Sequence, residues 1–279
     1  AFFINSVNKV FTGALVMKQV EQKKLKLNDK LSKFYPQVPH ANQITIGQLL
    51  TMEAGLQGKD ESSYGTPVFK NNQAGIKYDI KHNIVFNKKQ YNQRFYSSGN
   101  YILLSGILEK VTHRSYESLV KETYIKKLGL SETEFYWDIP KNKRIKVAVP
   151  YTKNSQGYLV PHSVSVDRVR GDLGAGSLVM SNSDLYRAMS AILNGEIIKP
   201  SSVQKVYAPA DPAKYNAGFY NFPDFHSSNG SGDGYTTYYR ISNDTRDVLV
   251  VQSNYPVKDY FKVREICNDI MENLIKSPS

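Results

Sequence analysis

The chain has 279 residues, and its 36 lysines and arginines outnumber its 25 aspartates and glutamates, which gives a net charge of +11. Hydrophobic residues make up 41% and charged residues 22%, values that indicate a folded protein and exclude a disordered one. The single cysteine, Cys267, excludes an internal disulfide framework, and no apolar run approaches the roughly 20 residues that span a bilayer. One large domain, or two unequal lobes, is therefore expected.

Helical periodicity of apolar residues predicts the elements of the first half of the chain. Ser6 stands at the N-cap or in the first turn of the first helix, and Gly55 ends the second helix. Residues 57–95 are polar with little periodicity, which predicts a long excursion over the surface. The helices predicted in this half span about 7–22, 45–56, 98–112 and 116–127.

The second half changes from helix to strand. Residues 131–177 are loop-rich with short strand-like pieces, and a helix follows from about Asn182 to Leu193, capped by Ser181 or Ser183. In the last third, Gly, Asn and Asp turns separate the strand-like runs YNAGFYNF, DFHSSN, GYTTYYRIS and RDVLVVQSN, and a final helix follows them. These patterns predict an α+β protein in which helices flank an antiparallel sheet and a mainly helical lobe is inserted beside it.

The positive charge does not follow a nucleic-acid-binding pattern. Basic residues are spread along the chain, and no helix-turn-helix, zinc-finger or RNP-type signature accompanies them. A diffuse positive field is enough to attract a polyanion, although a merely solvated basic surface explains the same composition. We therefore expect no nucleic-acid partner. The histidines have no ligand spacing, so we also expect no metal and no cofactor.

Ser6 and Lys9 place a hydroxyl and an amine one helical turn apart on the same face. A serine hydroxyl becomes a good nucleophile only when a neighbouring group takes its proton, and a lysine held close by can help to do so. The same spacing recurs at Ser118 and Ser202, where solvated helix residues explain it. At Ser6 the context differs, because an apolar lead-in precedes it and the small Gly13 follows, which lets another element approach closely. An ordinary N-cap serine remains the alternative.

Two further stretches carry residues suited to the same chemistry. Tyr96 lies at a tight turn that opens a helix, and a phenol beside a lysine can act as a general base. Residues 228–231 form a strand of small residues that runs into a glycine turn, so a substrate could lie along this strand and a backbone N–H could meet an oxyanion. A core tyrosine and a plain hairpin are the alternatives.

Taken in this order, the motifs resemble those of the serine β-lactamase and penicillin-binding-protein superfamily, in the branch of class C β-lactamases, D,D-peptidases and related esterases. That family has Ser-x-x-Lys, then Tyr-x-Asn, then a Lys-Thr-Gly or His-x-Gly strand. Further similar segments, which extend the resemblance over nearly the whole chain, are ITIGQLLTMEAGL, YSSGNYILLSGILEKVTHRSYESLVKE, IKKLGLSET and GAGSLVMSNSDLYRAM. The resemblance implies one β-lactamase-like catalytic domain over residues 1–279, with a helical lobe at about 45–200 and a sheet region at about 201–279 together with 1–30.

The resemblance also implies roles for individual residues. Ser6 corresponds to the nucleophile, Lys9 to its proton partner, and Tyr96 to the general base and leaving-group acid. The backbone N–H groups of Ser6 and Ser231 correspond to the oxyanion hole. Substrate binding would involve Ser98 and the third motif, which here reads Ser228-Asn229-Gly230. His226, two residues before that motif on the same face of the strand, could take the role of the missing cation.

The chain departs from the family pattern at four places. Ser98 replaces the asparagine of the second motif, Ser228 replaces the lysine or histidine of the third, and a segment that resembles His-x-Ser-Gly reads Met52-Glu53-Ala54-Gly55. The family also has strands and a helix before the nucleophile, whereas five residues precede Ser6 here. We therefore expect N-terminal elements, with any signal or membrane anchor, to be absent from this sequence.

These departures argue against efficient β-lactam hydrolysis, because groups that hold a peptide or lactam are missing. Esters need less assistance, and the resemblance extends to esterases that remove D-alanine from teichoic acids on Gram-positive envelopes. The expected protein is an extracellular, cell-surface serine hydrolase that acts on D-alanyl groups of a wall polymer. The alternatives are a penicillin-binding D,D-carboxypeptidase acting on peptidoglycan peptides, and a non-catalytic module that binds wall polymer.

Overall fold

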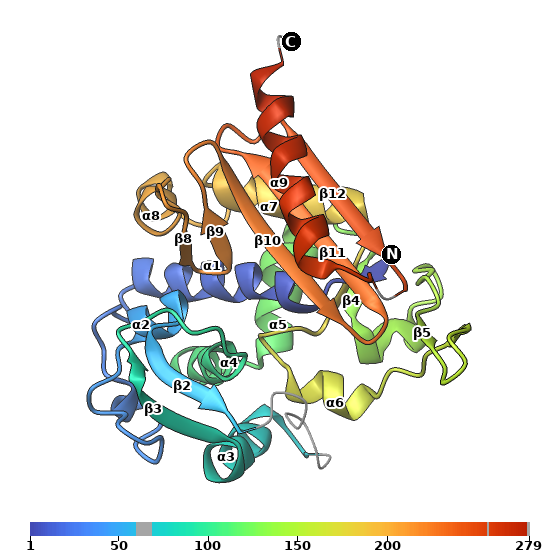
Figure 1. Cartoon of the computed structure of the whole chain (residues 1–279). Helices are drawn as coiled ribbons and strands as arrows, with labels where there is room; N and C mark the ends of the chain where they lie inside the picture. Colours follow the sequence, from blue (N-terminus) through green and yellow to red (C-terminus); the bar gives the residue numbers. More distant parts are fainter. Residues whose placement is uncertain (60–68, 256, 278–279) are drawn as a thin grey trace.

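A computed structural model describes residues 1–59, 69–255 and 257–277. Its centre is a five-stranded antiparallel sheet with strand order β12-β11-β10-β9-β8 (Figure 1). The alternation of the last third predicted this sheet, so the α+β prediction is confirmed. The strands are β8 (Lys214–Asn216), β9 (Phe219–Asn221), β10 (Phe225–Gly232), β11 (Tyr235–Ser242) and β12 (Val248–Ser253).

Helices cover both faces of this sheet (Figure 1). The terminal helix α9 (Tyr260–Lys276) packs on β11 and β12, and buried Arg240 of β11 donates hydrogen bonds to Asn268 Oδ1 and the Arg264 carbonyl of that helix. On the other face lie α1 (Asn8–Glu21) and α7 (Asn182–Leu193). The bounds of α7 match those of the helix predicted at Asn182 to Leu193. The main hydrophobic core includes residues of α1, α4, α7 and the sheet, so the helices and the sheet share one apolar interior.

The region below α1 in Figure 1 holds α4 (Gly99–Thr112), α5 (Tyr116–Val120) and α2 (Ile46–Thr51). The prediction that the second helix reaches Gly55 is wrong. Met52, in the left-handed conformation at φ 62°, ends α2, and Gly55 lies inside strand β2 (Ala54–Gly58) at φ 69°, where the pairing with β3 changes register.

The prediction of a long surface excursion over residues 57–95 is also wrong for much of that stretch. It contains helix α3 (Asn72–His82) and strand β3 (Ile84–Tyr91), which pairs with β2. Asn71 caps α3 by accepting a hydrogen bond from the backbone N–H of Ala74. The strand alternates poorly because its face is only partly buried, so periodicity gives little signal. Residues 60–68 of this stretch lie outside the described residues.

Smaller elements complete the fold. No helix among the described residues is both long enough and apolar enough to cross a membrane. A three-stranded sheet has the order β1-β7-β4, and a separate hairpin joins β5 to β6. The bounds are β1 (Phe2–Phe3), η1 (Asn5–Val7), η2 (Leu31–Lys33), η4 (Lys121–Lys126), β4 (Thr133–Phe135), η5 (Tyr136–Lys141), β5 (Tyr151–Lys153), β6 (Leu159–Pro161), α6 (Val166–Gly171), β7 (Leu178–Met180) and α8 (Pro200–Val206).

Glycines let α1 touch the turn between β8 and β9. A Cβ atom on Gly13 would lie 2.5 Å from the carbonyl oxygen of Ala217, and one on Gly218, at φ 97°, would lie 2.3 Å from the backbone nitrogen of Val10. Contacts this short leave no room for a side chain on either residue. The close approach expected from the small residue at position 13 is therefore present, and it fixes the distance between α1 and the sheet.

His226 lies on strand β10 together with Ser228, as the sequence predicted, but it is buried. Its imidazole is 4% exposed, contacts Phe219 and Tyr207, and shares a 2.8 Å hydrogen bond with Asn221 Oδ1. Burial lowers its pKa to about 4, so the ring is neutral near pH 7. The prediction that His226 could supply a cation to a substrate is therefore wrong.

We predict that Gly13→Ala destabilises the fold by about 1–3 kcal/mol, because the added methyl group must push the β8–β9 turn away from α1. Gly75→Ala in α3 is the matched control, since its Cβ would meet Phe69 at an ordinary 3.4 Å. It should be neutral, or stabilising by up to about 1 kcal/mol through helix propensity. Urea unfolding measures both variants, and equal shifts would contradict the proposed contact.

We also predict an acid-sensitive contribution from His226. In the unfolded chain the His226 imidazole takes up a proton below about pH 6.5, whereas in the folded chain it stays neutral down to about pH 4. The free energy of unfolding therefore falls as the pH is lowered from about 6.5 to about 4. The loss is on the order of 3 kcal/mol, and it is absent above pH 6.5. Urea unfolding at several pH values should show a flatter profile for His226→Gln. The exposed His82, changed to Gln, serves as a control that should keep the wild-type profile.

Candidate active site

The turn that carries Ser6 is pressed against strand β10. A Cβ atom on Gly230 would lie 2.2 Å from the carbonyl oxygen of Ile4 and 3.0 Å from the backbone nitrogen of Ser6. Asn5, in the left-handed conformation at φ 48°, donates a 3.1 Å hydrogen bond from Nδ2 to the carbonyl of Gly232. Ser6 lies in the short helix η1 and its hydroxyl caps no helix, which removes the N-cap alternative.

Lys9 is buried and directs its ammonium group at Ser6. Its Nζ donates to Ser6 Oγ at 2.9 Å and to the carbonyl of Ala175 at 3.2 Å, and it lies 3.5 Å from Ser98 Oγ. Only 1% of Lys9 is exposed. A buried ammonium group is costly unless oxygen atoms replace its water, and these three oxygens do so.

Tyr96 lies on the other side of this ammonium group. The centroid of its ring is 5.0 Å from Lys9 Nζ, and 40% of the residue is exposed. Met52 anchors the segment, because its carbonyl accepts from the N–H of Phe95 at 2.9 Å and its sulfur accepts from the N–H of Ser97 at 3.3 Å. The hydroxyl and the ammonium group of one predicted motif and the phenol of a distant one therefore meet in one place.

The Ala175 carbonyl is a contact that sequence reasoning missed. It comes from the turn at residues 174–176, where Gly174 packs against Tyr101 and Ser105 of α4 and Gly176 packs against Asn5. Both glycines are needed because a side chain on either would strike a neighbouring element. The Gly-Ala-Gly run was visible in the sequence and could have indicated this close packing.

A cavity of about 540 Å³ opens in front of Ser6. One wall of the cavity is β10. Its pairing with β11 runs from Phe225 to Gly232, whereas its pairing with β9, among the described residues, involves His226 and Ser227 alone. The edge of β10 from residue 228 to 231 therefore faces the cavity rather than another strand. A linear substrate can lie along such an edge and reach Ser6.

The residues of the predicted third motif lie along this wall, with different roles for their side chains. Ser228, Asn229 and Ser231 line the cavity, whereas Gly230 supplies the space for the Ser6 turn. The hydroxyl of Ser228 donates to the Gly218 carbonyl at 3.1 Å, and Asn229 Oδ1 accepts from Arg240 at 2.8 Å. These two side chains therefore stabilise the wall, and the backbone of the strand is what faces a substrate.

No sequence motif indicated the other residues that line the cavity. Tyr215 and Tyr220 come from the β8–β9 hairpin, Tyr260 and Phe261 from the start of α9, and Arg94 from the loop before Tyr96. The list is completed by Gly218 and by Arg264 of α9. The cavity combines aromatic walls with two arginines.

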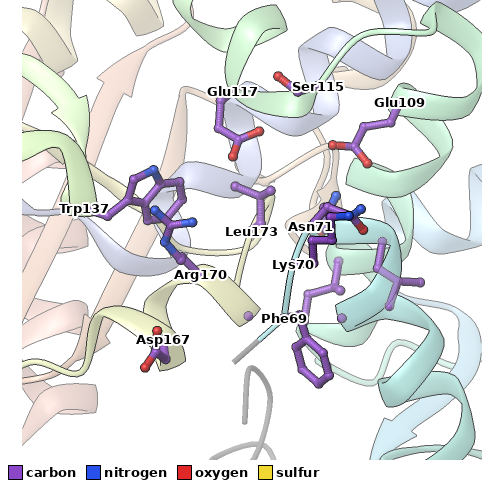
Figure 2. Close-up of a pocket in the computed structure, with 15 residues that line it drawn as sticks. Phe69, Lys70, Asn71, Glu109, Ser115, Glu117, Trp137, Asp167, Arg170 and Leu173 are labelled. Atoms are coloured by element: carbon purple, nitrogen blue, oxygen red, sulfur yellow. The ribbon is translucent and has the colours of Figure 1, made fainter. Parts of the chain in front are cut away.

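A second cavity, of about 200 Å³, lies between α3, α4 and α6 (Figure 2). Figure 2 shows Trp137 and Arg170 on one side of it and Lys70 and Glu109 on the other. It shares no lining residue with the Ser6 cavity, so it is separate from the cluster of Ser6, Lys9 and Tyr96. In the part of the chain that is described, no group of three or more His, Cys, Asp or Glu side chains could hold a metal ion.

The Ser6 cluster has the parts needed for nucleophilic catalysis. The Ser6 hydroxyl is in hydrogen-bond contact with the amine of buried Lys9, the ring of Tyr96 lies against the same amine, and Ser6 and Tyr96 line a solvent-accessible cavity. The backbone of η1 and the edge of β10 lie on either side of the hydroxyl, where N–H groups could meet an oxyanion. This arrangement suits acyl transfer.

Comparisons with known proteins agree with this geometry. The chain is 29% identical over 281 residues to the teichoic acid D-alanine hydrolase of Staphylococcus aureus. The aligned region covers 97% of this chain and 66% of that relative. The crystal structure of FmtA from Staphylococcus aureus matches with a TM-score of 0.82 and 26% identity, over 97% of this chain and 73% of that one. The fold is shared with an octameric penicillin-binding protein homologue from Pyrococcus abyssi. The match has 21% identity and a TM-score of 0.77, and it covers 97% of this chain and 66% of that one.

The chain spans 66% of the length of the curated relatives that it matches. The family described as Beta-lactamase matches residues 1–266, which is nearly the whole sequence. The family resemblance inferred from the three motifs is confirmed, and the chain belongs to the Beta-lactamase family.

Proposed function

We propose that this chain is the catalytic part of a cell-surface serine hydrolase that removes D-alanyl groups from a wall polymer, with D-alanyl esters of teichoic acid as the substrate. The observation that carries the proposal is the hydrogen bond between buried Lys9 and Ser6 beside Tyr96, next to a 540 Å³ cavity that Ser6 and Tyr96 line. The name of the Staphylococcus aureus relative supports the choice of acyl group and polymer.

The reaction proceeds in two steps through an acyl-enzyme. Ser6 Oγ attacks the ester carbonyl while Tyr96, as a phenolate stabilised by the charge of Lys9, takes the hydroxyl proton. The N–H groups of Ser6 and Ser231 bind the oxyanion, and the proton returns from Tyr96 to the departing alkoxide of the polymer. In the second step water attacks the D-alanyl ester on Ser6, which releases D-alanine and restores the hydroxyl.

The composition of the cavity favours an ester over an amide. Ser98 replaces the asparagine that would hold a peptide or lactam carbonyl, and the hydroxyl of Ser228 is already bonded to the Gly218 carbonyl. His226 is buried and neutral, so it does not replace the missing cation. An alkoxide leaves more readily than an amine, so an ester needs less of this assistance.

The surroundings of the enzyme follow from the same proposal. A polymer of the bacterial wall is accessible from outside the cell, so we place the protein at the surface of a Gram-positive bacterium. The source of the teichoic acid D-alanine hydrolase relative supports this location. A net charge of +11 favours approach to an anionic polymer.

We predict that the purified protein releases D-alanine from D-alanylated teichoic acid, and that Ser6→Ala abolishes the release. Free D-alanine can be measured with a D-amino-acid oxidase assay, and intact-mass analysis should detect a D-alanyl adduct on the wild type alone. No release from the wild type, or equal release from Ser6→Ala, would count against the proposal.

Fluorescent penicillin provides the control for the competing functions. Rapid labelling that Ser6→Ala abolishes, without release of D-alanine from the polymer, would favour a D,D-carboxypeptidase instead. Binding of polymer without labelling of Ser6 by either acyl donor would favour a non-catalytic module.

We further predict that Lys9→Met lowers the rate of acyl transfer to Ser6 by about 10²–10⁴-fold, the usual contribution of a proton-transfer partner. The stability of the fold should change little, because removing a buried charge offsets the loss of its hydrogen bonds. Lys18→Met, on the same helix but among the lining of another pocket, is the control and should keep the wild-type rate. Full labelling of Lys9→Met at the wild-type rate would refute the role of Lys9.

A further inference from the structure

The cavity in front of Ser6 is positively charged. Arg94 and Arg264 line it, and no aspartate or glutamate is among the described residues that do so. Lys9 adds a third cation at the base of the same site. The two arginines come from different elements, since Arg94 precedes the Tyr96 motif and Arg264 lies in the second turn of α9 (Figure 1).

Both guanidinium groups are held against aromatic rings rather than carboxylates. Arg94 lies over Tyr220 at 5.6 Å from the ring centroid, and Arg264 lies over Phe261 at 5.2 Å. None of the ion pairs found among the described residues uses either arginine. A guanidinium group stacked by its face keeps its N–H edges for an anion.

Tyr220 lies within the field of all three cations. Burial raises the pKa of its phenol, whereas the charges of Arg94, Arg264 and Lys9 each act to lower it. Three cations from α1, α9 and the loop before Tyr96 are thus near enough to one cavity-lining phenol to act on it electrostatically. An anion in this cavity would meet Arg94 and Arg264 while another part of the same molecule reaches Ser6.

The proposed substrate has anions at the corresponding places. In a polyol phosphate chain, an alanylated hydroxyl lies a few bonds from a phosphodiester on either side. The D-alanyl group itself carries an ammonium ion, which a cavity with three cations and no carboxylate would repel. The phosphodiesters remove this repulsion, so the chain binds where an isolated D-alanyl ester would bind poorly.

Resting on the proposed function, we propose that Arg94 and Arg264 form a phosphodiester subsite, each binding one of the two phosphates that flank the ester attacked by Ser6. The subsite makes the polymer, rather than the D-alanyl group alone, the determinant of specificity. A peptide substrate would present a single terminal carboxylate and would leave one arginine without a counter-ion. Two separated arginines therefore favour a repeating polyanion.

The test compares Arg94→Gln and Arg264→Gln with the wild type on two substrates. For D-alanylated glycerol phosphate polymer, KM should rise about tenfold for each variant, the size of one charge-assisted hydrogen bond, and the rise should shrink at high salt. For p-nitrophenyl acetate, a neutral ester without phosphate, kcat/KM should stay within about twofold of the wild type. Arg144→Gln, which removes the same charge from an exposed position elsewhere, is the control and should change neither value.

Two results would overturn the proposal. An unchanged KM for the polymer in both variants would remove the arginines from substrate binding, and equal losses on both esters would mean that they support the fold of the cavity. Thermal unfolding checks the fold of each variant, and Arg94→Lys and Arg264→Lys, which keep the charge, should recover part of the polymer affinity. A larger effect on a D-alanyl peptide than on the polymer would assign the arginines to a peptide carboxylate instead.

A binding measurement separates this subsite from the hydrolase proposal. Ser6→Ala protein should bind glycerol phosphate polymer that carries no D-alanine, and adding Arg94→Gln or Arg264→Gln should weaken that binding whether or not the wild type releases D-alanine. Inorganic phosphate at the same total phosphate concentration should compete poorly. If it competes as well as the polymer does, the site binds single phosphates and the polymer subsite is refuted.

Discussion

The burial of the Lys9 ammonium group is the constraint on which the site depends. With 1% of the residue exposed, the charge must be solvated by protein oxygens, and these come from Ser6, Ser98 and Ala175. The three acceptor oxygens belong to segments far apart in the sequence, so the fold has to bring a helix, a loop and a turn to the same point. An ammonium group held this way polarises the serine hydroxyl and lies against Tyr96, so the interaction that stabilises the charge also assembles the reactive groups.

Backbone packing, rather than side-chain packing, sets the distances around that charge. Gly230 brings β10 to the Ser6 turn, Gly218 brings the β8–β9 turn to α1, and Gly174 brings the turn of Ala175 to α4. At each position a Cβ would lie under 3 Å from another backbone or side-chain atom, so the elements could not come this close with a larger residue. The proposed oxyanion position between η1 and β10 depends on the first of these contacts. Glycines, which have no side chain, thus set the distances between the elements that carry the site.

The sequence predicted what depends on local pattern and on motif order. Helix α7 matches its predicted bounds, and Ser6, Lys9 and Tyr96 meet as their order in the motifs implied. The pairing of β2 with β3 was missed because β3 is only partly buried and because the left-handed conformation of Gly55 resembles a helix C-cap. His226 was misjudged because alternation gives the face of a strand but not what covers it. Arg94 and Arg264, 170 positions apart, share a wall only in three dimensions, so no local pattern could relate them.

The charge of the cavity links the departures from the family motifs to the substrate. Ser228 stands where relatives of this branch have a lysine or histidine, and its hydroxyl is bonded within the protein, so the cation at that position is lost. The cavity nevertheless keeps cations, because Arg94 and Arg264 line it. A cation within the motif suits a carboxylate close to the scissile bond, whereas cations from the loop before Tyr96 and from α9 suit anions carried elsewhere on the substrate. An ester whose charges lie along the chain of its leaving group meets that description, and a peptide that ends in a carboxylate beside its scissile bond does not.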